Sequence, residues 1–258
     1  MDVLAQTQTG WRYLPPEMRR ALGGLQFRPR IRAHGRVSGL HLSSHQGQSL
    51  EFSDLKGYAF GDDPRGIDWK VFARTDKLYV RRYLDETNLT AHLLIDASGS
   101  MAYPDRPSKF EHAARMMAGL AYVLLRQGDE VGLLVAHERR PAVCPPRAVP
   151  SHLGELMSVL ERAHPSHKTV IQDAVGGVAD RSLKNGVLIV ASDLLAPWEA
   201  MLDLLGGLVA RGFVVILLHV LSPEERTFPF QGAVVFGNLE TGRTDLVDAR
   251  GLKQHYMT

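Results

Sequence analysis

One carboxylate and two hydroxyls stand at alternate positions in the segment Asp96-Ala-Ser98-Gly-Ser100. The apolar run Leu93–Ile95 leads directly into Asp96, and an uninterrupted apolar run before an amphipathic segment is typical of a buried parallel strand. Ligands of open α/β sheets collect where such strands end. Carboxylate and hydroxyl oxygens suit Mg²⁺, which keeps several waters and takes few protein ligands. We therefore consider Asp96, Ser98 and Ser100 candidate ligands of a divalent cation, although strand ends also carry Asp and Ser as turn formers.

Two more oxygen donors occupy matching places in the chain. Asp193 follows a second apolar run, Val187–Ala191, and Thr169 precedes the helical stripe that leads to this run. Both have a purely structural interpretation as well. Thr169 with Gln172 fits a capping box, in which the hydroxyl only caps the helix. Asp193 could likewise cap the helix that follows it.

The elements that must position these donors alternate between strand and helix from residue 91 onward. Such alternation is typical of a parallel sheet with helical crossovers, so the sequence predicts a doubly wound, mostly parallel α/β sheet flanked by helices. A capping box at Ser108–Glu111 is predicted to begin a long helix that Gly128 ends. Strands are expected at 91–96, 131–135, 187–191 and 213–220, an antiparallel edge within 138–149, a hairpin over 233–247, and helices at 108–128, 153–160, 171–178 and 197–209.

The segment before residue 91 has a different character. Residues 1–30 are predicted to be an arm with one short helix after Pro15 and Pro16, and residues 31–90 a small β-rich appendage with a strand at Leu78–Leu84. Residues 91–258 form the predicted α/β domain. The first 40 residues carry a net charge of +5, against +2 for the whole chain. Because little aromatic content separates these arginines, we expect a solvated, partly disordered lead-in and no nucleic-acid binding.

Composition excludes several classes of protein. A chain of 258 residues with 45% apolar and 22% charged residues is typical of a soluble globular protein. Cys144 is the only cysteine, so an intrachain disulfide or a multi-thiolate metal cluster is impossible, and an inert packed thiol is expected.

The N-terminus lacks a signal-peptide pattern, and the longest apolar run, 213–221, is shorter than the ~20 residues of a membrane span. We therefore expect a cytoplasmic protein. The histidine pairs His41/His45 and His164/His167 are interpreted as chance pairs on the surface.

Together the five oxygen donors resemble the metal-ion-dependent adhesion site (MIDAS) of von Willebrand factor A domains. The resemblance implies a Rossmann-like fold of that type. It further implies that Mg²⁺, or Mn²⁺ or Ca²⁺ as substitutes, is held directly or nearly directly by Ser98, Ser100 and Thr169. Asp96 and Asp193 would hold waters and supply charge, and one coordination position would stay open for an Asp or Glu of a partner protein. The sequence gives no sign of a regulatory helix or of a second metal site of that family, so integrin-like switching is not implied.

A second motif, within residues 50–81, resembles the stretch that defines a bacterial family known as domain of unknown function 58, and the likeness extends over about residues 33–250. Its spacing does not fit a calcium loop. We expect Asp62, Asp63 and Asp68 to pair with Arg65, Lys70 or Arg74 and to attach the appendage to the sheet.

Members of this family usually continue past the last hairpin into a further helix. This chain stops at Thr258, so one sheet face is expected to be less covered. The motif residues singled out are Gly61, Asp62, Asp63, Pro64, Arg65, Asp68, Trp69 and Arg74.

The resemblance implies a non-enzymatic, Mg²⁺-dependent module for protein–protein interaction. Family members are typically encoded beside MoxR-type AAA ATPases, and such pairs are thought to assemble or activate other proteins. The alternative is a metal-dependent phosphoryl-transfer or hydrolytic enzyme that uses Asp96. A phosphatase of the haloacid-dehalogenase type needs a second Asp where Ser98 stands, and a serine hydrolase needs G-x-S-x-G, which neither serine satisfies.

Overall fold

The computed structural model describes residues 10–27, 29, 51–62, 64–84, 89–104, 107–137, 140–166, 169, 171–181, 186–195 and 198–256. The chain divides into two compact units. The larger comprises residues 1–33 and 89–258, and the smaller comprises residues 34–88. The candidate ligands all belong to the larger unit. His41, His45, Asp63 and His167 lie outside the described residues.

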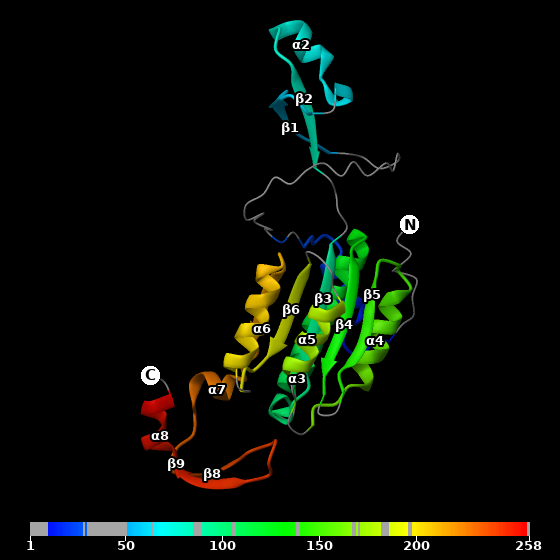
Figure 1. The fold of residues 1–258 in the computed structure, drawn as a ribbon. Coiled ribbons are helices and arrows are strands. Elements are labelled where there is room, and N and C mark those ends of the chain that lie inside the picture. Colours follow the sequence, from blue (N-terminus) through cyan, green and yellow to red (C-terminus); the bar gives the residue numbers. More distant parts are fainter. Residues whose placement is uncertain are drawn as a thin grey trace. The chain divides into compact units, whose positions relative to one another are not determined.

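The larger unit contains a five-stranded sheet and the helices that cover it (Figure 1). Its elements are α1 (Pro16–Leu22), β3 (Thr90–Asp96), η3 (Gly99–Ala102), α3 (Lys109–Gln127), β4 (Glu130–Ala136), β5 (Ala142–Arg147), α4 (His152–Arg162), α5 (Ile171–Arg181), β6 (Val187–Ser192), α6 (Trp198–Ala210), β7 (Val214–His219), α7 (Pro223–Thr227), β8 (Ala233–Gly237), β9 (Thr244–Asp248) and α8 (Ala249–Tyr256).

The strand order β5-β4-β3-β6-β7 places β3 at the centre. β3 pairs in parallel with β4 and β6, β7 adds a further parallel strand, and β5 is an antiparallel edge. The chain thus winds outward from β3 in both directions, which is the doubly wound arrangement in which ligands bind where the strand order reverses. The prediction of a mostly parallel α/β sheet flanked by helices is confirmed, and so is the antiparallel edge.

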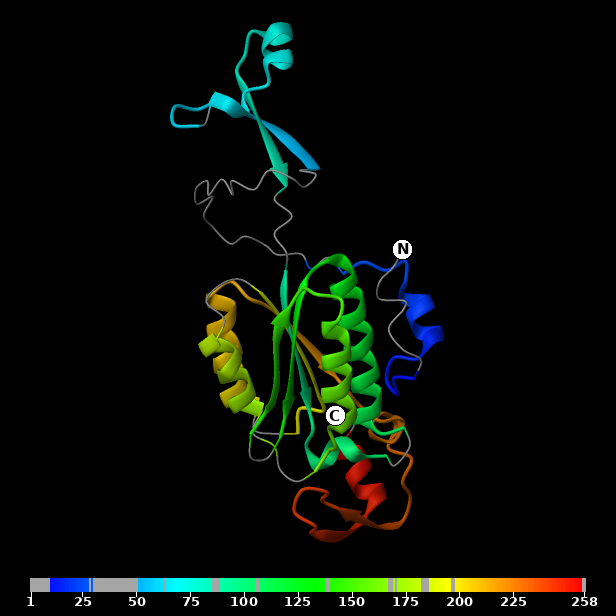
Figure 2. The same ribbon diagram turned by 90° about the vertical axis from the view of Figure 1, so that its right-hand side faces the viewer.

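The apolar runs at β3, β4 and β6 become strands that are buried on both faces, whereas β7 at the edge of the sheet is partly exposed. Along β3, Leu93 and Ile95 contribute to one core, with α3 and α4, while Leu94 contributes to the other, with α5 and α6. Figure 2 shows these helix pairs on opposite sides of the sheet. Because side chains alternate along a strand, a run of apolar residues with both faces covered is what a parallel sheet requires.

The long helix α3 begins and ends where the sequence predicts. The Ser108 hydroxyl accepts a hydrogen bond from the Glu111 amide, and Gly128 ends the helix with a positive φ of 88°. The capping box is only half formed, because the Glu111 carboxylate pairs with Arg12 of the N-terminal segment. A complete box occurs at α7, where Ser222 and Glu225 cap each other. This helix start was not predicted, although the sequence Ser-Pro-Glu-Glu carries the signal for it.

The prediction of a solvated lead-in is wrong for residues 10–27. Tyr13 and Leu14 are buried in the core on the α3 side of the sheet, and a Cβ at Gly119 would lie 2.8 Å from the Met18 methyl carbon. α1 therefore packs on α3 through a position that has no side chain. The basic character of the segment does not prevent this, since Arg12 forms its ion pair with Glu111 of α3.

The smaller unit contains β1 (Glu51–Gly57), η2 (Pro64–Gly66), α2 (Trp69–Thr75) and β2 (Tyr79–Leu84), with β1 and β2 antiparallel. The predicted turn has a positive φ of 104° at Gly61. Asp62 forms an ion pair with Lys56, at 2.9 Å, a partner that was not among those expected. Asp68 caps α2 by accepting from the amides of Lys70 and Val71. Of the other motif residues, Pro64 and Arg65 lie in η2 and Trp69 and Arg74 in α2.

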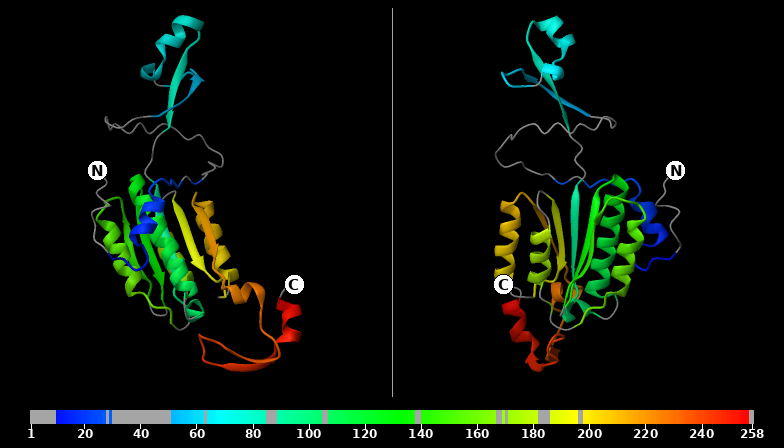
Figure 3. Two further views of the ribbon diagram at one scale, coloured as in Figure 1. Left: turned by 180° about the vertical axis from the view of Figure 1, so that it is seen from behind. Right: turned by 45° about the vertical axis from the view of Figure 1, so that its right-hand side comes forward.

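The C-terminal segment follows β7 with α7, the hairpin β8–β9 and α8. We expected no helix after the hairpin, and this is wrong, because Ala249–Tyr256 is helical, with Ala249 fully buried. Figures 1 and 3 show the segment beyond the carboxyl ends of the parallel strands. A Cβ added at Gly99 would lie 2.6 Å from the Leu239 carbonyl oxygen, so the loop of the hairpin contacts the loop after β3.

Candidate functional site

Asp96 lies at the carboxyl end of the central strand and is fixed there by two hydrogen bonds. Its Oδ1 accepts from the Ser98 amide at 2.9 Å, and its Oδ2 accepts from the Ser192 hydroxyl at 2.7 Å. The side chain is buried. Burial raises the pKa of Asp96, and the charge of Asp193 raises it further, although the hydrogen bonds from Ser192 and Ser98 oppose the shift. A cation beside Asp96 would relieve this cost, because an opposite charge favours the ionised form.

The two serines of the Asp-x-Ser-x-Ser segment point their hydroxyls at each other. Ser98 Oγ and Ser100 Oγ are 3.0 Å apart, and the chain between them is the start of η3. Gly99 is required between them because the Leu239 carbonyl occupies the place of a side chain. The two oxygens are thus held close together at the edge of the sheet, as neighbouring ligands of one ion are.

Thr169 lies in the loop before α5, and this loop is attached to the same edge. The Ser166 amide donates to the Ala97 carbonyl oxygen at 3.0 Å, next to Ser98 in the chain. Thr169 is buried, and its Oγ1 has no hydrogen-bond partner among the residues that the structure describes. The capping interpretation with Gln172 is therefore not supported. A buried hydroxyl without a partner costs about 1–3 kcal/mol, and such a group is explained when a ligand or ion completes it.

Asp193 follows β6 directly, on the strand beside β3. Its Oδ2 accepts from the Lys109 ammonium at 2.8 Å, and its Oδ1 accepts from the Leu195 amide at 3.3 Å. The next residue, Leu194, has a positive φ of 58°, which is uncommon for a residue with a side chain. The Leu194 amide donates to Ser192 Oγ, the same hydroxyl that binds Asp96. One serine therefore couples the two strand ends.

Lys109 is the ammonium partner of Asp193. The sequence did not predict this residue as part of the site. The lysine side chain is 2% exposed and also donates to Glu225 of α7 at 2.6 Å. Burial alone lowers the pKa of an ammonium, but the hydrogen bonds and charges of Asp193 and Glu225 outweigh it, so the pKa of Lys109 is raised. No sequence pattern joins Lys109 to Glu225, which lies 116 residues away in the chain.

The donor set fits a hard divalent cation. Both oxygens of each aspartate already accept a bond from the protein. The hydroxyls of Ser98 and Ser100 lie together directly after Asp96, and Thr169 adds a buried hydroxyl in the loop that is hydrogen-bonded to Ala97 through Ser166. Asp193 and Glu225 pair with the Lys109 ammonium, and the charge of Asp193 also acts on Asp96, so the three carboxylates and one ammonium sum to a formal charge of −2. Oxygen ligands with this charge suit Mg²⁺.

The family model described as "Protein of unknown function DUF58" matches residues 54–258. The chain belongs to the DUF58 family. The match begins in β1 of the smaller unit and covers all five oxygen donors. The resemblance that rested on the motif around Gly61–Lys70 is thereby confirmed. For this DUF58 chain, every described helix is too short or too polar to span a lipid bilayer.

This DUF58 chain is similar in sequence to an uncharacterized mycobacterial protein and in structure to two proteins from Bacteroides. The "Uncharacterized protein Rv1480" of Mycobacterium tuberculosis is 26% identical over 231 residues, which cover 88% of this chain and 72% of that protein. Among solved structures, "conserved hypothetical protein BatB" from Bacteroides thetaiotaomicron is 18% identical, with a TM-score of 0.44 over 66% of this chain and 85% of that one. An aerotolerance-related membrane protein from Bacteroides fragilis is 19% identical, with a TM-score of 0.45 over 66% and 86%.

Proposed function

We propose that this DUF58 chain is a Mg²⁺-dependent module for protein–protein interaction. Ser98, Ser100 and Thr169 would hold the cation, and Asp96 and Asp193 would supply the compensating charge through waters. The observation that carries the proposal is the buried Thr169 hydroxyl without a partner. The bound ion would supply a Lewis acid with a coordination position for a carboxylate of another protein. The partner class that we propose, from the resemblance to the family, is a MoxR-type AAA ATPase.

The enzymatic alternative is less favoured by the surroundings of Asp96. A nucleophilic carboxylate must present a free oxygen to its substrate. Here the side chain is buried, and each oxygen is held by a hydrogen bond, from Ser98 and from Ser192. This arrangement suits a group that orients its neighbours and supplies charge.

The test uses two isosteric variants whose stabilities should move in opposite directions. Thr169→Val removes a hydroxyl that has no partner, so without metal it should raise stability, by up to about 1–3 kcal/mol. Thr90→Val, the matched control, removes a hydroxyl that donates to Glu130 at 2.8 Å and should lose about 1 kcal/mol. Wild type and Thr90→Val should both gain about 2.7 kcal/mol when Mg²⁺ reaches 100 times its Kd. Thr169→Val should lose most of that gain.

The measurement is thermal and urea unfolding with EDTA, Mg²⁺ and Mn²⁺. An identical response to Mg²⁺ in wild type and Thr169→Val would contradict the role of this hydroxyl. The partner half of the proposal is tested separately with a purified MoxR-type AAA ATPase from the source organism. Its binding should require Mg²⁺ and be abolished by EDTA and by Asp96→Ala; binding that is indifferent to both would overturn it.

A further inference from the structure

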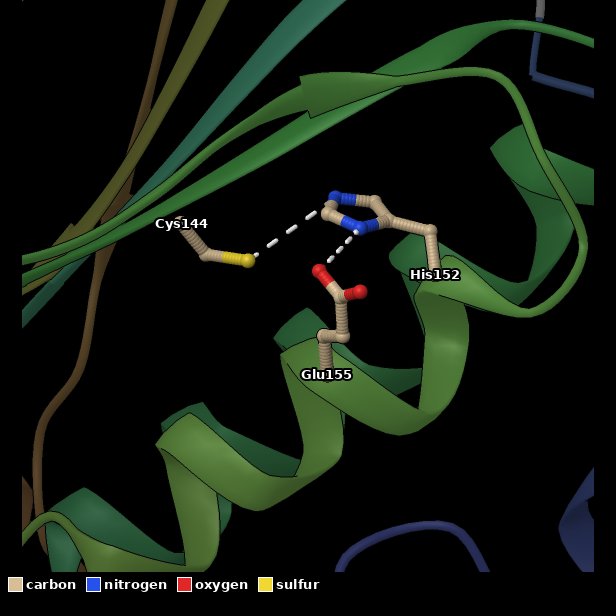
Figure 4. Close-up of side chains that lie close together, drawn as sticks. All are labelled: Cys144, His152 and Glu155. Carbon is tan, nitrogen blue, oxygen red and sulfur yellow. Dashed lines mark hydrogen bonds and ion pairs between the residues drawn. The ribbon is translucent and has the colours of Figure 1, made fainter.

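A second cluster of potential metal ligands lies between β5 and α4, away from the candidate site. Cys144 of β5 faces His152 and Glu155 of the first turn of α4 (Figure 4). One ligand atom from each side chain can be chosen so that all three lie within 4.8 Å of one another. His152 also contacts Val131, the second residue of β4, whereas Asp96 is paired with Ala136 at the opposite end of that strand. The cluster is therefore separate from the oxygen donors at the carboxyl edge.

The hydrogen bonds of His152 determine which ring nitrogen is available. Nε2 is 3.0 Å from the Val131 carbonyl oxygen. A carbonyl oxygen can only accept, so Nε2 carries the proton. A metal-binding histidine usually donates its second N–H in this way, and the bond fixes the ring orientation. Nδ1 then points toward the Glu155 carboxylate, at 3.0 Å from Oε2.

Cys144 completes the set from the opposite side. Its Sγ is 3.8 Å from His152 Nε2, and Figure 4 shows the sulfur, the ring edge and the Glu155 carboxylate turned toward a common point. With metal–ligand bonds of about 2.0–2.3 Å, ligand atoms around a tetrahedral zinc ion lie roughly 3.5 Å apart. The separation of the two ligand atoms Nδ1 and Glu155 Oε2, 3.0 Å, is about half an ångström below that value. Sγ lies 3.8 Å from the other ring nitrogen, and the three ligand atoms within 4.8 Å of one another would have to draw closer around an ion.

We propose that Cys144, His152 and Glu155 form a binding site for a borderline-soft divalent transition metal, Zn²⁺ above all. A thiolate, an imidazole and a carboxylate are zinc ligands, whereas Mg²⁺ does not select sulfur. Zinc would replace the thiol proton and any proton on Nδ1, which pass to solvent. Cys144 and His152 are buried, but the Glu155 side chain is 54% exposed, so an ion can enter beside it and a water can take the fourth position.

Cobalt distinguishes this site from the oxygen site, because Co²⁺ bound to a thiolate gives an intense near-ultraviolet charge-transfer band. The chain has one cysteine, so such a band can arise only at Cys144. The full chain, stripped with EDTA and kept reduced, is titrated with Co²⁺. We expect a band that saturates at one equivalent, disappears in Cys144→Ser, persists in Asp96→Ala and is bleached by Zn²⁺. The absence of a band in wild type with a free thiol would overturn the proposal.

A second pair of variants tests the carboxylate. Glu155 is half-exposed, so Glu155→Gln leaves the core intact and should weaken Co²⁺ binding at least about tenfold, as expected for a change at a metal site. Glu161→Gln on the same helix, whose carboxylate accepts from the Arg12 amide, should bind Co²⁺ as wild type does. Equal affinities of the two variants would remove Glu155 from the ligand set.

Discussion

At the carboxyl ends of β3 and β6, oxygen donors lie beside buried carboxylates that outnumber their ammonium partner. Between β5 and α4, a thiol, an imidazole and a carboxylate contact one another, and the Val131 carbonyl oxygen accepts from the imidazole. Both regions contain a buried acid whose pKa is raised mainly by burial, Asp96 in the first and Cys144 in the second. They differ in completeness. The Thr169 hydroxyl lacks a partner, while both ring nitrogens of His152 have one.

The two candidate metal sites therefore differ in whether their polar atoms have partners before a metal binds. The candidate oxygen site has a formal negative charge and, among the described residues, a buried hydroxyl without a partner, which an added cation would satisfy. The sulfur site is complete without metal and would accept one by giving up protons. A buried atom without a partner therefore marks the oxygen site as a candidate metal site. The Cys144–His152–Glu155 cluster is a candidate because of the types and the orientation of its ligand atoms.

The largest effect should come from the ammonium at the oxygen site. Lys109→Met leaves Asp193 and the partly buried Glu225 without their counter-charge, and breaking a buried pair on one side costs about 3–5 kcal/mol. Urea unfolding in EDTA measures the loss, and Mg²⁺ should restore part of it by replacing the missing charge. A loss below about 1 kcal/mol, typical of exposed pairs, would show that this region is as self-sufficient as the other.

A smaller effect, and a stabilising one, is expected at the end of the central strand. Asp96→Asn removes a buried acid whose pKa is raised, and a carboxyl group with a raised folded-state pKa opposes folding once it ionises. The penalty is absent below the unfolded-state pKa and grows, by about 1.4 kcal/mol per pH unit, until the folded-state pKa is reached. In EDTA, Asp96→Asn should therefore exceed wild type in stability at pH 7, and the two should converge near pH 4. A constant difference across that range would contradict this account.

The smallest effect is expected at the exposed side of the Cys144–His152–Glu155 cluster. Arg147 pairs with Glu155 at 3.3 Å, and both side chains are more than half exposed. Such pairs contribute about 0–1 kcal/mol, so Arg147→Ala should change urea stability by no more than that. A much larger loss would mean that the cluster depends on its exposed ion pair, and the contrast with Lys109 would disappear.

Sequence patterns predicted the parts of this structure that follow from local chemistry. Continuous apolar runs predicted β3 and β6, and the polar residues after them, Asp96 and Asp193, lie at adjacent strand ends because parallel strands share an edge. Whether Mg²⁺ and a partner protein bind there stays a prediction. The roles of Glu225 were not predicted. Its capping bond to Ser222 has a local sequence signal, but its contact with Lys109 joins segments that are far apart in the chain.

Other features could not be found in the sequence for related reasons. The packing of α1 on α3 depends on a space above Gly119, and one short helix carries no periodicity that reveals its apolar face. The contact of Cys144 with His152 crosses a turn between a strand and a helix, so no regular spacing indicates it. Pairings across elements are decided by the tertiary fold.

The contact between Gly99 and the carbonyl oxygen of Leu239 has a practical consequence. The Leu239 side chain is 53% exposed, although its backbone touches the loop that carries Ser98 and Ser100. A fluorophore attached at position 239 would thus be exposed to solvent, while the backbone that carries it contacts that loop. Such a label would sense rearrangements of the loop from outside, with every candidate ligand left unaltered.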